Sequence, residues 1–101
     1  MEEDEKPWFC YMVQCRDGAY YSGVATDVAE RVKEHNWGVG ARFTEKRRPV
    51  RLVWWEKHPS QASARKREKE IKGWRRQKKA ELIRQQAAGT DLSPAKNAGS
   101  G

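Results

Sequence analysis

Apolar and aromatic positions divide the chain into short elements, and the first element is the most apolar. Residues 8–13 read WFCYMV, which predicts a strand that is buried on both faces. Asp17 and Gly18 follow, and an Asp-Gly pair between two β-prone runs predicts a hairpin that leads into a second strand over residues 20–24. Gly23 inside that strand indicates a close approach of the backbone to a helix or to a substrate.

A first helix is predicted directly after the second strand. Thr26 is expected to cap the free backbone amides, and the Asp27 carboxylate favours the positive end of the helix. Apolar side chains four residues apart give this helix a buried stripe. The helix should end near Asn36, because Gly38 just beyond it is a typical terminator.

The rest of the pattern predicts a loop, a third strand and two further helices. Residues 37–49 contain two glycines, a proline and a basic patch, which is typical of a loop, and residues 50–56 form the third strand. A second helix is expected over residues 59–72, broken by Gly73, and a third, very basic helix over residues 75–86. The order β-β-α-β-α-α predicts an α+β fold, one three-stranded sheet flanked by helices that cover both faces of its apolar first strand.

The two ends of the chain differ from this pattern in composition. Residues 1–6 are acidic and lack an apolar stretch, so we expect a disordered arm and no secretory signal. Residues 88–101 are rich in Gly, Ser, Pro, Ala and Asn, which predicts a disordered tail. Residues 7–87 are left as a single folded domain. No run approaches the ~18 apolar residues of a transmembrane helix, which excludes a membrane-spanning protein.

The distribution of charge along the chain indicates what kind of partner the protein binds. The chain has 21 Lys and Arg against 14 Asp and Glu, a formal net charge of +7. Between Arg42 and Arg84 there are sixteen basic and five acidic residues, so this stretch alone carries +11. A basic block with interleaved aromatic residues attracts polyanions, which favours nucleic acid as partner over a merely solvated surface.

The two cysteines indicate a reducing cellular compartment and do not predict a disulfide or a zinc site. Cys10 and Cys15 lie in one apolar run, five residues apart, so they point to opposite faces of a strand and cannot bridge. The chain has no Cys-x-x-Cys, and its histidines are not spaced as zinc partners for these thiols. We interpret both as small core residues of a protein in a reducing, cytoplasmic compartment.

Three groups of residues could carry chemistry. Arg31 and His35 are four residues apart on one helix face, at the edge of the buried stripe, where an ordinary exposed pair is the alternative. Glu68 lies in the apolar stripe of the second helix, which requires either a buried ion pair or a cation such as Mg²⁺. Tyr11 and Tyr21 lie on the two hairpin strands. Core packing is their default role, but basic neighbours could lower the pKa of a phenol toward that of a general base.

Together these residues resemble the GIY-YIG nucleases, in particular the small, single-domain bacterial branch. The resemblance runs from about residue 7 to residue 83, with the motifs in matching order and spacing. Those motifs are YYSGV at residues 20–24, TD at 26–27, Arg31, HN at 35–36, RRPV at 47–50 and REKEIKGW at 67–74. The resemblance implies a three-stranded antiparallel sheet with flanking helices.

Position by position, the resemblance implies a catalytic centre. The two tripeptides of the family fall on FCY at residues 9–11 and YSG at residues 21–23. Its catalytic arginine and histidine fall on Arg31 and His35, and its metal-binding glutamate falls on Glu68. The implied activity is divalent-metal-dependent hydrolysis of DNA phosphodiester bonds.

In the implied mechanism Glu68 holds Mg²⁺ or Mn²⁺ and Arg31 holds a phosphate oxygen. Tyr11 deprotonates the water, Tyr21 positions water or phosphate, and His35 supports a phenol. The sequence leaves open which of Tyr11, Tyr21 and His35 is the base.

Basic residues around this centre are expected to hold the nucleic-acid backbone. They are Arg42, Lys46, Arg47, Arg48, Lys72, Arg75, Arg76, Lys78 and Lys79. Trp37 and Phe43 are expected to stack on unpaired bases, with core packing as the alternative for Phe43. We expect a monomeric enzyme acting on single-stranded or structured DNA. The rival hypotheses are a non-catalytic module that binds RNA or DNA with the same face, and a structural interaction protein.

Overall fold

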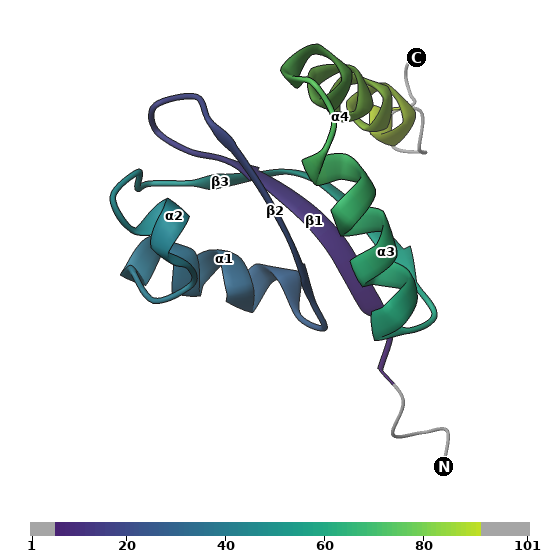
Figure 1. Ribbon diagram of the computed structural model, residues 1–101, viewed down its shortest axis with the longest axis horizontal. Helices are drawn as coiled ribbons and strands as arrows, with labels where there is room; N and C mark the ends of the chain where they lie inside the picture. Colours follow the sequence, from purple (N-terminus) through teal and green to yellow (C-terminus); the bar gives the residue numbers. More distant parts are fainter. Residues whose placement is uncertain (1–5, 92–101) are drawn as a thin grey trace.

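The computed structural model describes residues 6–91, and three antiparallel strands lie at its centre (Figure 1). The strands are β1 (Trp8–Gln14), β2 (Tyr20–Ala25) and β3 (Arg51–His58), in the sheet order β2-β1-β3. The first strand of the chain is therefore the central one, and Tyr11 on it pairs with Gly23 on β2. The three-stranded antiparallel sheet is confirmed.

The hairpin between β1 and β2 is confirmed as well. The Asp17 carboxylate accepts a hydrogen bond from the backbone N–H of Ala19 at 3.1 Å, and the N–H of Cys15 donates to the Ala19 carbonyl at 2.8 Å. Gly18 has φ of +91°, a conformation that a glycine adopts without strain. These local contacts fix the register in which the two strands pair.

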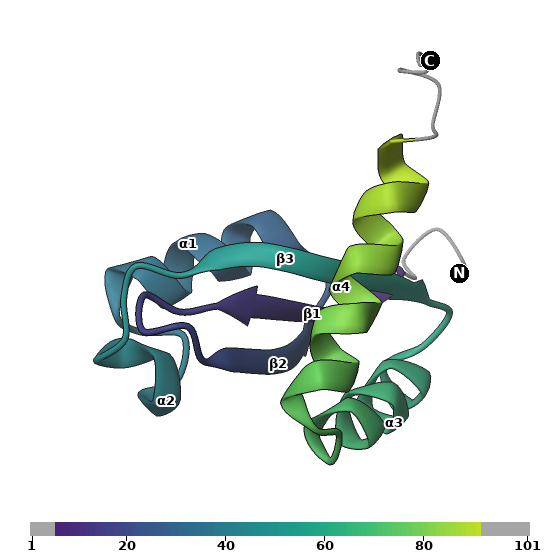
Figure 2. The same ribbon diagram turned by 90° about the horizontal axis from the view of Figure 1, so that it is seen from above.

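Helices pack on both faces of the sheet (Figure 2). They are α1 (Val28–Trp37), the short α2 (Arg42–Glu45), α3 (Gln61–Lys72) and α4 (Arg76–Asp91). Side chains alternate along β1, so the face that carries Tyr11 packs with α1, and the face that carries Cys10 packs with α3 and α4. This two-sided cover explains why the central strand is apolar on both faces.

The helix ends agree with the predictions in most places. Gly38 ends α1 with φ of +90°, and its N–H donates to the carbonyls of Glu34 and His35. The Ser60 side chain caps α3 by accepting from the Ser63 N–H, and Gly73 ends that helix. No helix within residues 6–91 has both the length and the apolar character needed to cross a membrane.

Three details differ from the predictions. Asp27, not Thr26, caps α1, because its carboxylate accepts from the N–H of Glu30 at 3.0 Å. The expected loop over residues 37–49 contains α2, and α4 extends past residue 86 to Asp91. Most of the predicted arm (residues 1–5) and of the predicted tail (residues 92–101) lies outside the described residues.

One contact joins α4 to the edge of the sheet. β3 lies at the edge, and the backbone N–H and C=O of Trp55 face outward from it. The Gln86 side-chain amide accepts from the Trp55 N–H at 3.1 Å and donates to the Trp55 carbonyl at 2.6 Å. A single side chain thus supplies both hydrogen bonds that a neighbouring strand would offer here.

Candidate functional site

A buried chain of hydrogen bonds links β1, α1 and α2. Tyr11 is 1% exposed, and its hydroxyl lies 2.8 Å from Nε2 of His35, which is itself fully buried. On the other side of the ring, Nδ1 of His35 lies 2.8 Å from Oγ1 of Thr44. The Thr44 hydroxyl lies 3.1 Å from the carbonyl oxygen of Ala41. Two of the predicted catalytic residues are therefore in direct contact, and Thr44 extends the chain.

Two glycines make room for this chain. A Cβ on Gly23 would lie 2.6 Å from the Tyr11 hydroxyl oxygen, and a Cβ on Gly40 would overlap the His35 ring. The backbone at Gly23 thus approaches the Tyr11 phenol, which corrects the expectation of a helix or a substrate at this point. Gly40 and Thr44 were not singled out from the sequence. Both lie among basic and aromatic residues that show no periodic spacing, so no local sequence pattern indicates a functional role for them.

Tyr21 forms the next layer of the site. Its ring packs edge-on against His35, with the centroids 5.3 Å apart, and stacks on Phe43 at 5.8 Å. The Arg47 guanidinium lies 4.0 Å from the centroid of the Phe43 ring. Phe43 thus contacts two partners, but it is 39% exposed and does not belong to the buried core that the packing alternative expected. Trp37 is 64% exposed and leaves its indole available for stacking.

The two charged candidates, Arg31 and Glu68, flank the tyrosines. Arg31 forms an ion pair with Glu34, Nε to Oε1 at 2.9 Å, and lies close enough to Tyr11 for its positive charge to lower the pKa of that phenol. Glu68 on α3 is 18% exposed and acts on the Tyr11 pKa in the opposite direction. All five predicted residues thus belong to one neighbourhood, built from β1, β2, α1 and α3.

Burial dominates the acid–base properties of this neighbourhood. It raises the pKa of Tyr11 well above its usual value, and Arg31 offsets only part of this effect. The expectation of a lowered pKa is therefore wrong for Tyr11, because desolvation outweighs the neighbouring guanidinium. Burial, followed by the charge of Arg31, lowers the pKa of His35. His35 is accordingly neutral at pH 7 and has a lone pair with which to accept a proton.

Glu68 is the residue that suits a divalent cation. Within residues 6–91 its ion-pair partner is Lys72, with Nζ 3.0 Å from Oε2, and Lys72 also lies 5.5 Å from the Tyr21 ring centroid. The same part of the chain contains no cluster of three or more His, Cys, Asp or Glu side chains that could enclose a metal. A single carboxylate fits Mg²⁺, which keeps several waters and takes further oxygen ligands from a phosphate.

The predicted backbone-binding residues fall into two groups. Several are engaged within the protein: Arg47 with Asp17 and the Phe43 carbonyl, Arg48 with the carbonyls of Glu45 and Asn36, Lys72 with Glu68, Arg76 over the Tyr20 ring, and Lys78 over the Trp74 ring. Arg42, Lys46 and Arg75 are exposed, and Lys79 is half-buried. The first group makes contacts within the protein, although its members Arg48, Lys72, Arg76 and Lys78 are themselves exposed.

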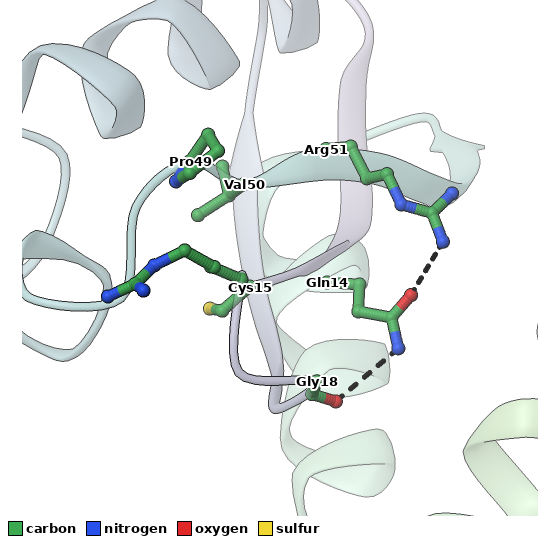
Figure 3. A pocket seen from close by; sticks show the side chains of 7 residues that line it. Gln14, Cys15, Gly18, Pro49, Val50 and Arg51 are labelled. Atoms are coloured by element: carbon green, nitrogen blue, oxygen red, sulfur yellow. Dashed lines mark hydrogen bonds between the residues drawn. The ribbon is translucent and has the colours of Figure 1, made fainter.

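A hollow of about 400 Å³ lies where the hairpin meets the start of β3 (Figure 3). Arg51 donates to Gln14 Oε1 at 2.8 Å, and Gln14 Nε2 donates to the Gly18 carbonyl at 3.4 Å. Arg16, also in the lining, donates to the Arg48 carbonyl at 2.9 Å. The hollow contains none of the five candidate residues, so it is separate from the tyrosine–histidine centre.

Comparison with known families identifies the fold and the motifs together. The family described as "GIY-YIG catalytic domain" matches residues 7–81. The chain belongs to the GIY-YIG family. This assignment places it in a family of nucleases that generally use divalent metals.

Relatives agree with the GIY-YIG assignment. A UPF0213 protein of Staphylococcus aureus (strain Mu3 / ATCC 700698) is 51% identical over 77 residues, which cover 76% of this chain and 94% of the relative. The solution NMR structure of a UPF0213 protein from Bacillus halodurans has 37% identity and a TM-score of 0.52, and covers 86% of this chain and 97% of its own. A solution NMR structure from E. faecalis has 34% identity and a TM-score of 0.57, with coverages of 82% and 88%. The described chain thus resembles small GIY-YIG proteins over nearly their whole length.

Proposed function

We propose that this protein is a divalent-metal-dependent endonuclease that hydrolyses phosphodiester bonds in DNA. The observation that carries the proposal is the contact of the Tyr11 hydroxyl with Nε2 of His35, at 2.8 Å, between the opposite charges of Arg31 and Glu68. A buried phenol hydrogen-bonded to a neutral imidazole forms a path along which a proton can leave a water molecule.

The contact of Tyr11 with His35 and the two pKa shifts support one proton path. A phenol is protonated at pH 7, and burial raises the pKa of Tyr11 further, so Tyr11 does not ionise on its own. The phenol oxygen therefore takes the proton of the attacking water while its own proton passes to Nε2 of His35. The products of this transfer are a hydroxide aimed at phosphorus, a neutral Tyr11 and an imidazolium at His35. Tyr11 is the base that touches water, and His35 is the final acceptor.

The charged residues stabilise the phosphate on either side. Arg31 would hold a non-bridging oxygen of the scissile phosphate, where a guanidinium offers two parallel donors. Mg²⁺ or Mn²⁺ held by Glu68 would supply charge stabilisation for the scissile phosphate and the leaving 3′ oxygen. Tyr21, packed on His35, would limit the space in which water and phosphate lie.

Contacts away from the centre would provide affinity without base recognition. Arg42, Lys46 and Arg75 are exposed basic residues that suit the phosphate backbone, and such contacts weaken steeply as salt rises. All five candidate residues come from one chain, so a single copy suffices for the proposed chemistry. DNA in single-stranded or structured form is the proposed substrate, and Trp37 would stack on an unpaired base.

A cleavage assay tests the proposal directly. Labelled single-stranded, duplex, flap and RNA oligonucleotides are incubated with the protein in Mg²⁺, Mn²⁺ or EDTA. We expect metal-dependent nicking that Glu68→Gln lowers by at least about a hundredfold, since several kcal/mol of transition-state stabilisation depend on that carboxylate. Binding in EDTA should persist in the variant.

Glu70→Gln is the matched control for this assay. Glu70 lies on the same helix, but its side chain is 50% exposed and pairs with Arg67, outside the candidate centre. Its substitution should leave cleavage unchanged. Binding without cleavage in every metal, by the wild type and Glu68→Gln alike, would instead identify the rival binding module.

A further inference from the structure

The Thr44 hydroxyl contacts one of the two ring nitrogens of His35, and which of these nitrogens carries the proton depends on the tautomer. Thr44 is fully buried, and its Oγ1 lies between two polar atoms, Nδ1 of His35 at 2.8 Å and the carbonyl oxygen of Ala41 at 3.1 Å. A threonine hydroxyl has one proton and two lone pairs. A carbonyl oxygen can only accept, so a Thr44 hydroxyl that donates to Ala41 turns a lone pair toward Nδ1 of His35.

From this geometry we infer that Thr44 holds His35 in the tautomer with the proton on Nδ1. Nδ1–H then donates to Thr44, and Nε2 is left without a proton and accepts from the Tyr11 hydroxyl, 2.8 Å away. Thr44 is thus a positioning residue that acts through His35, and this inference rests on the proposed function for its catalytic meaning. The hydrogen bond at one ring nitrogen sets the state of the other.

The alternative tautomer would block the proton path. With its proton on Nε2, the imidazole would donate to the Tyr11 oxygen and offer no lone pair to receive the phenol proton. The rings could keep the same positions, and yet the transfer from Tyr11 to His35 could not occur. A wrong histidine tautomer in otherwise intact geometry lowers turnover by up to about 10⁴-fold in the serine proteases.

The loop around α2 keeps Thr44 in place. Gly40 brings the backbone against the His35 ring, and the Arg47 N–H donates to the Thr44 carbonyl at 2.9 Å. The Arg47 side chain is in turn tied to Asp17 at the hairpin, Nε to Oδ2 at 3.1 Å. The loop therefore connects the hairpin, Thr44 and the buried ring of His35.

Nitrogen NMR of the imidazole side chains tests the inference without any cleavage. Uniformly ¹⁵N-labelled full-length protein is recorded at about pH 8, where His35 is neutral because burial lowers its pKa. The chain has two histidines, so a His58→Gln variant assigns the signals. We expect a protonated Nδ1 and an unprotonated Nε2 at His35, in the wild type and in Thr44→Ser, whereas Thr44→Val should move the proton to Nε2.

Kinetics supply the second readout. Thr44→Val keeps the size of the side chain and should lower kcat by about 10²–10⁴-fold, with KM for the oligonucleotide nearly unchanged. Thr44→Ser keeps the hydroxyl and should retain most of the wild-type kcat. Melting curves verify that both variants fold, and the wild-type spectrum alone remains decisive where Thr44→Val does not fold.

The possible results separate the inference from the proposed function. A proton on Nε2 in the wild type, or an unchanged tautomer in folded Thr44→Val, overturns the role of Thr44. A protein with the expected tautomer that cuts none of the oligonucleotides overturns the nuclease proposal and leaves the assignment of the proton intact.

Discussion

Tyr11 on β1 lies directly opposite Gly23 on β2, and its phenol occupies the space that a side chain at residue 23 would fill. The pairing register of the hairpin therefore directs the phenol toward His35. A shift of one residue would turn Tyr11 to the opposite face of the sheet. The sheet register is thus part of the construction of the candidate site, and the turn at Gly18 sets it.

Gly23→Ala should damage both stability and cleavage. Its Cβ would lie 2.6 Å from the Tyr11 hydroxyl oxygen, so the phenol or the strand has to move. We expect a loss of about 1–3 kcal/mol in the free energy of unfolding, and at least about a tenfold loss of activity. Gly73→Ala is the control, because its nearest contact is an ordinary 3.6 Å. Equal effects of the two substitutions would contradict the argument.

Tyr11→Phe should abolish most of the cleavage and leave the fold intact. The substitution removes the hydroxyl that bridges water and Nε2 of His35, so the rate should fall by about 10²–10⁴-fold in a single-turnover assay. Tyr20→Phe is the comparison. Tyr20 lies on β2 with its ring beneath Arg76, and its substitution should leave the rate essentially unchanged. A Tyr11→Phe variant that cuts at the wild-type rate would remove the phenol from the mechanism.

His35 should make the protein less stable in mild acid. Its pKa is lowered from the usual 6.5 by burial and by Arg31, so below pH 6.5 the unfolded chain binds a proton that the folded protein does not. The free energy of unfolding should therefore fall as the pH drops below 6.5 and should be fully retained above it. Cleavage should fall in the same direction, since a protonated His35 cannot accept the Tyr11 proton.

Denaturant titrations between about pH 5 and pH 7.5 measure this dependence. The wild-type slope in that window should be reduced in His35→Gln, which has no imidazole to titrate. Parallel slopes for the two proteins would show that another group is responsible.

Lys46 and Arg47 are neighbours with different expected roles. Lys46 is exposed, so Lys46→Ala should lower the salt dependence of DNA binding by about one unit of slope, with an unchanged melting temperature. Arg47 is tied to Asp17 and lies over the Phe43 ring, a cation–π contact worth about 0.5–1 kcal/mol at an exposed site. Arg47→Ala should therefore lower the melting temperature. Fluorescence anisotropy and thermal melts separate the two effects, and a reversed pattern would refute the division.

The features predicted correctly from the sequence are those that neighbouring residues determine. Asp17 and Gly18 form their turn with residues a few positions away, and Gly38 ends its helix in the same manner. The cap of α1 shows the limit of this approach. Thr26 and Asp27 both carry suitable oxygens, and only the backbone conformation places that of Asp27 beside the Glu30 N–H.

The features that were missed depend on contacts between distant segments. The loop around α2 is held by a contact between Arg47 and Asp17, which are 30 residues apart in the sequence. The composition of the loop alone therefore does not predict its short helix. The Thr44 hydroxyl contacts His35 across the same loop, and nothing in the sequence around either residue predicts this contact. The pKa of Tyr11 was predicted in the wrong direction because the number of basic neighbours is visible in a sequence, whereas the degree of desolvation is not.

The amide of Gln86 has a consequence for how the molecule behaves in a crowded solution. With both polar groups of Trp55 engaged, the outer edge of β3 is interrupted at this residue as a template for the strand of another molecule. Loss of the Gln86 side chain would expose the backbone N–H and C=O of Trp55, a residue that is itself 46% exposed. A variant shortened before Gln86 would thus combine an unpaired strand with an apolar surface, the two ingredients of self-association through intermolecular sheets.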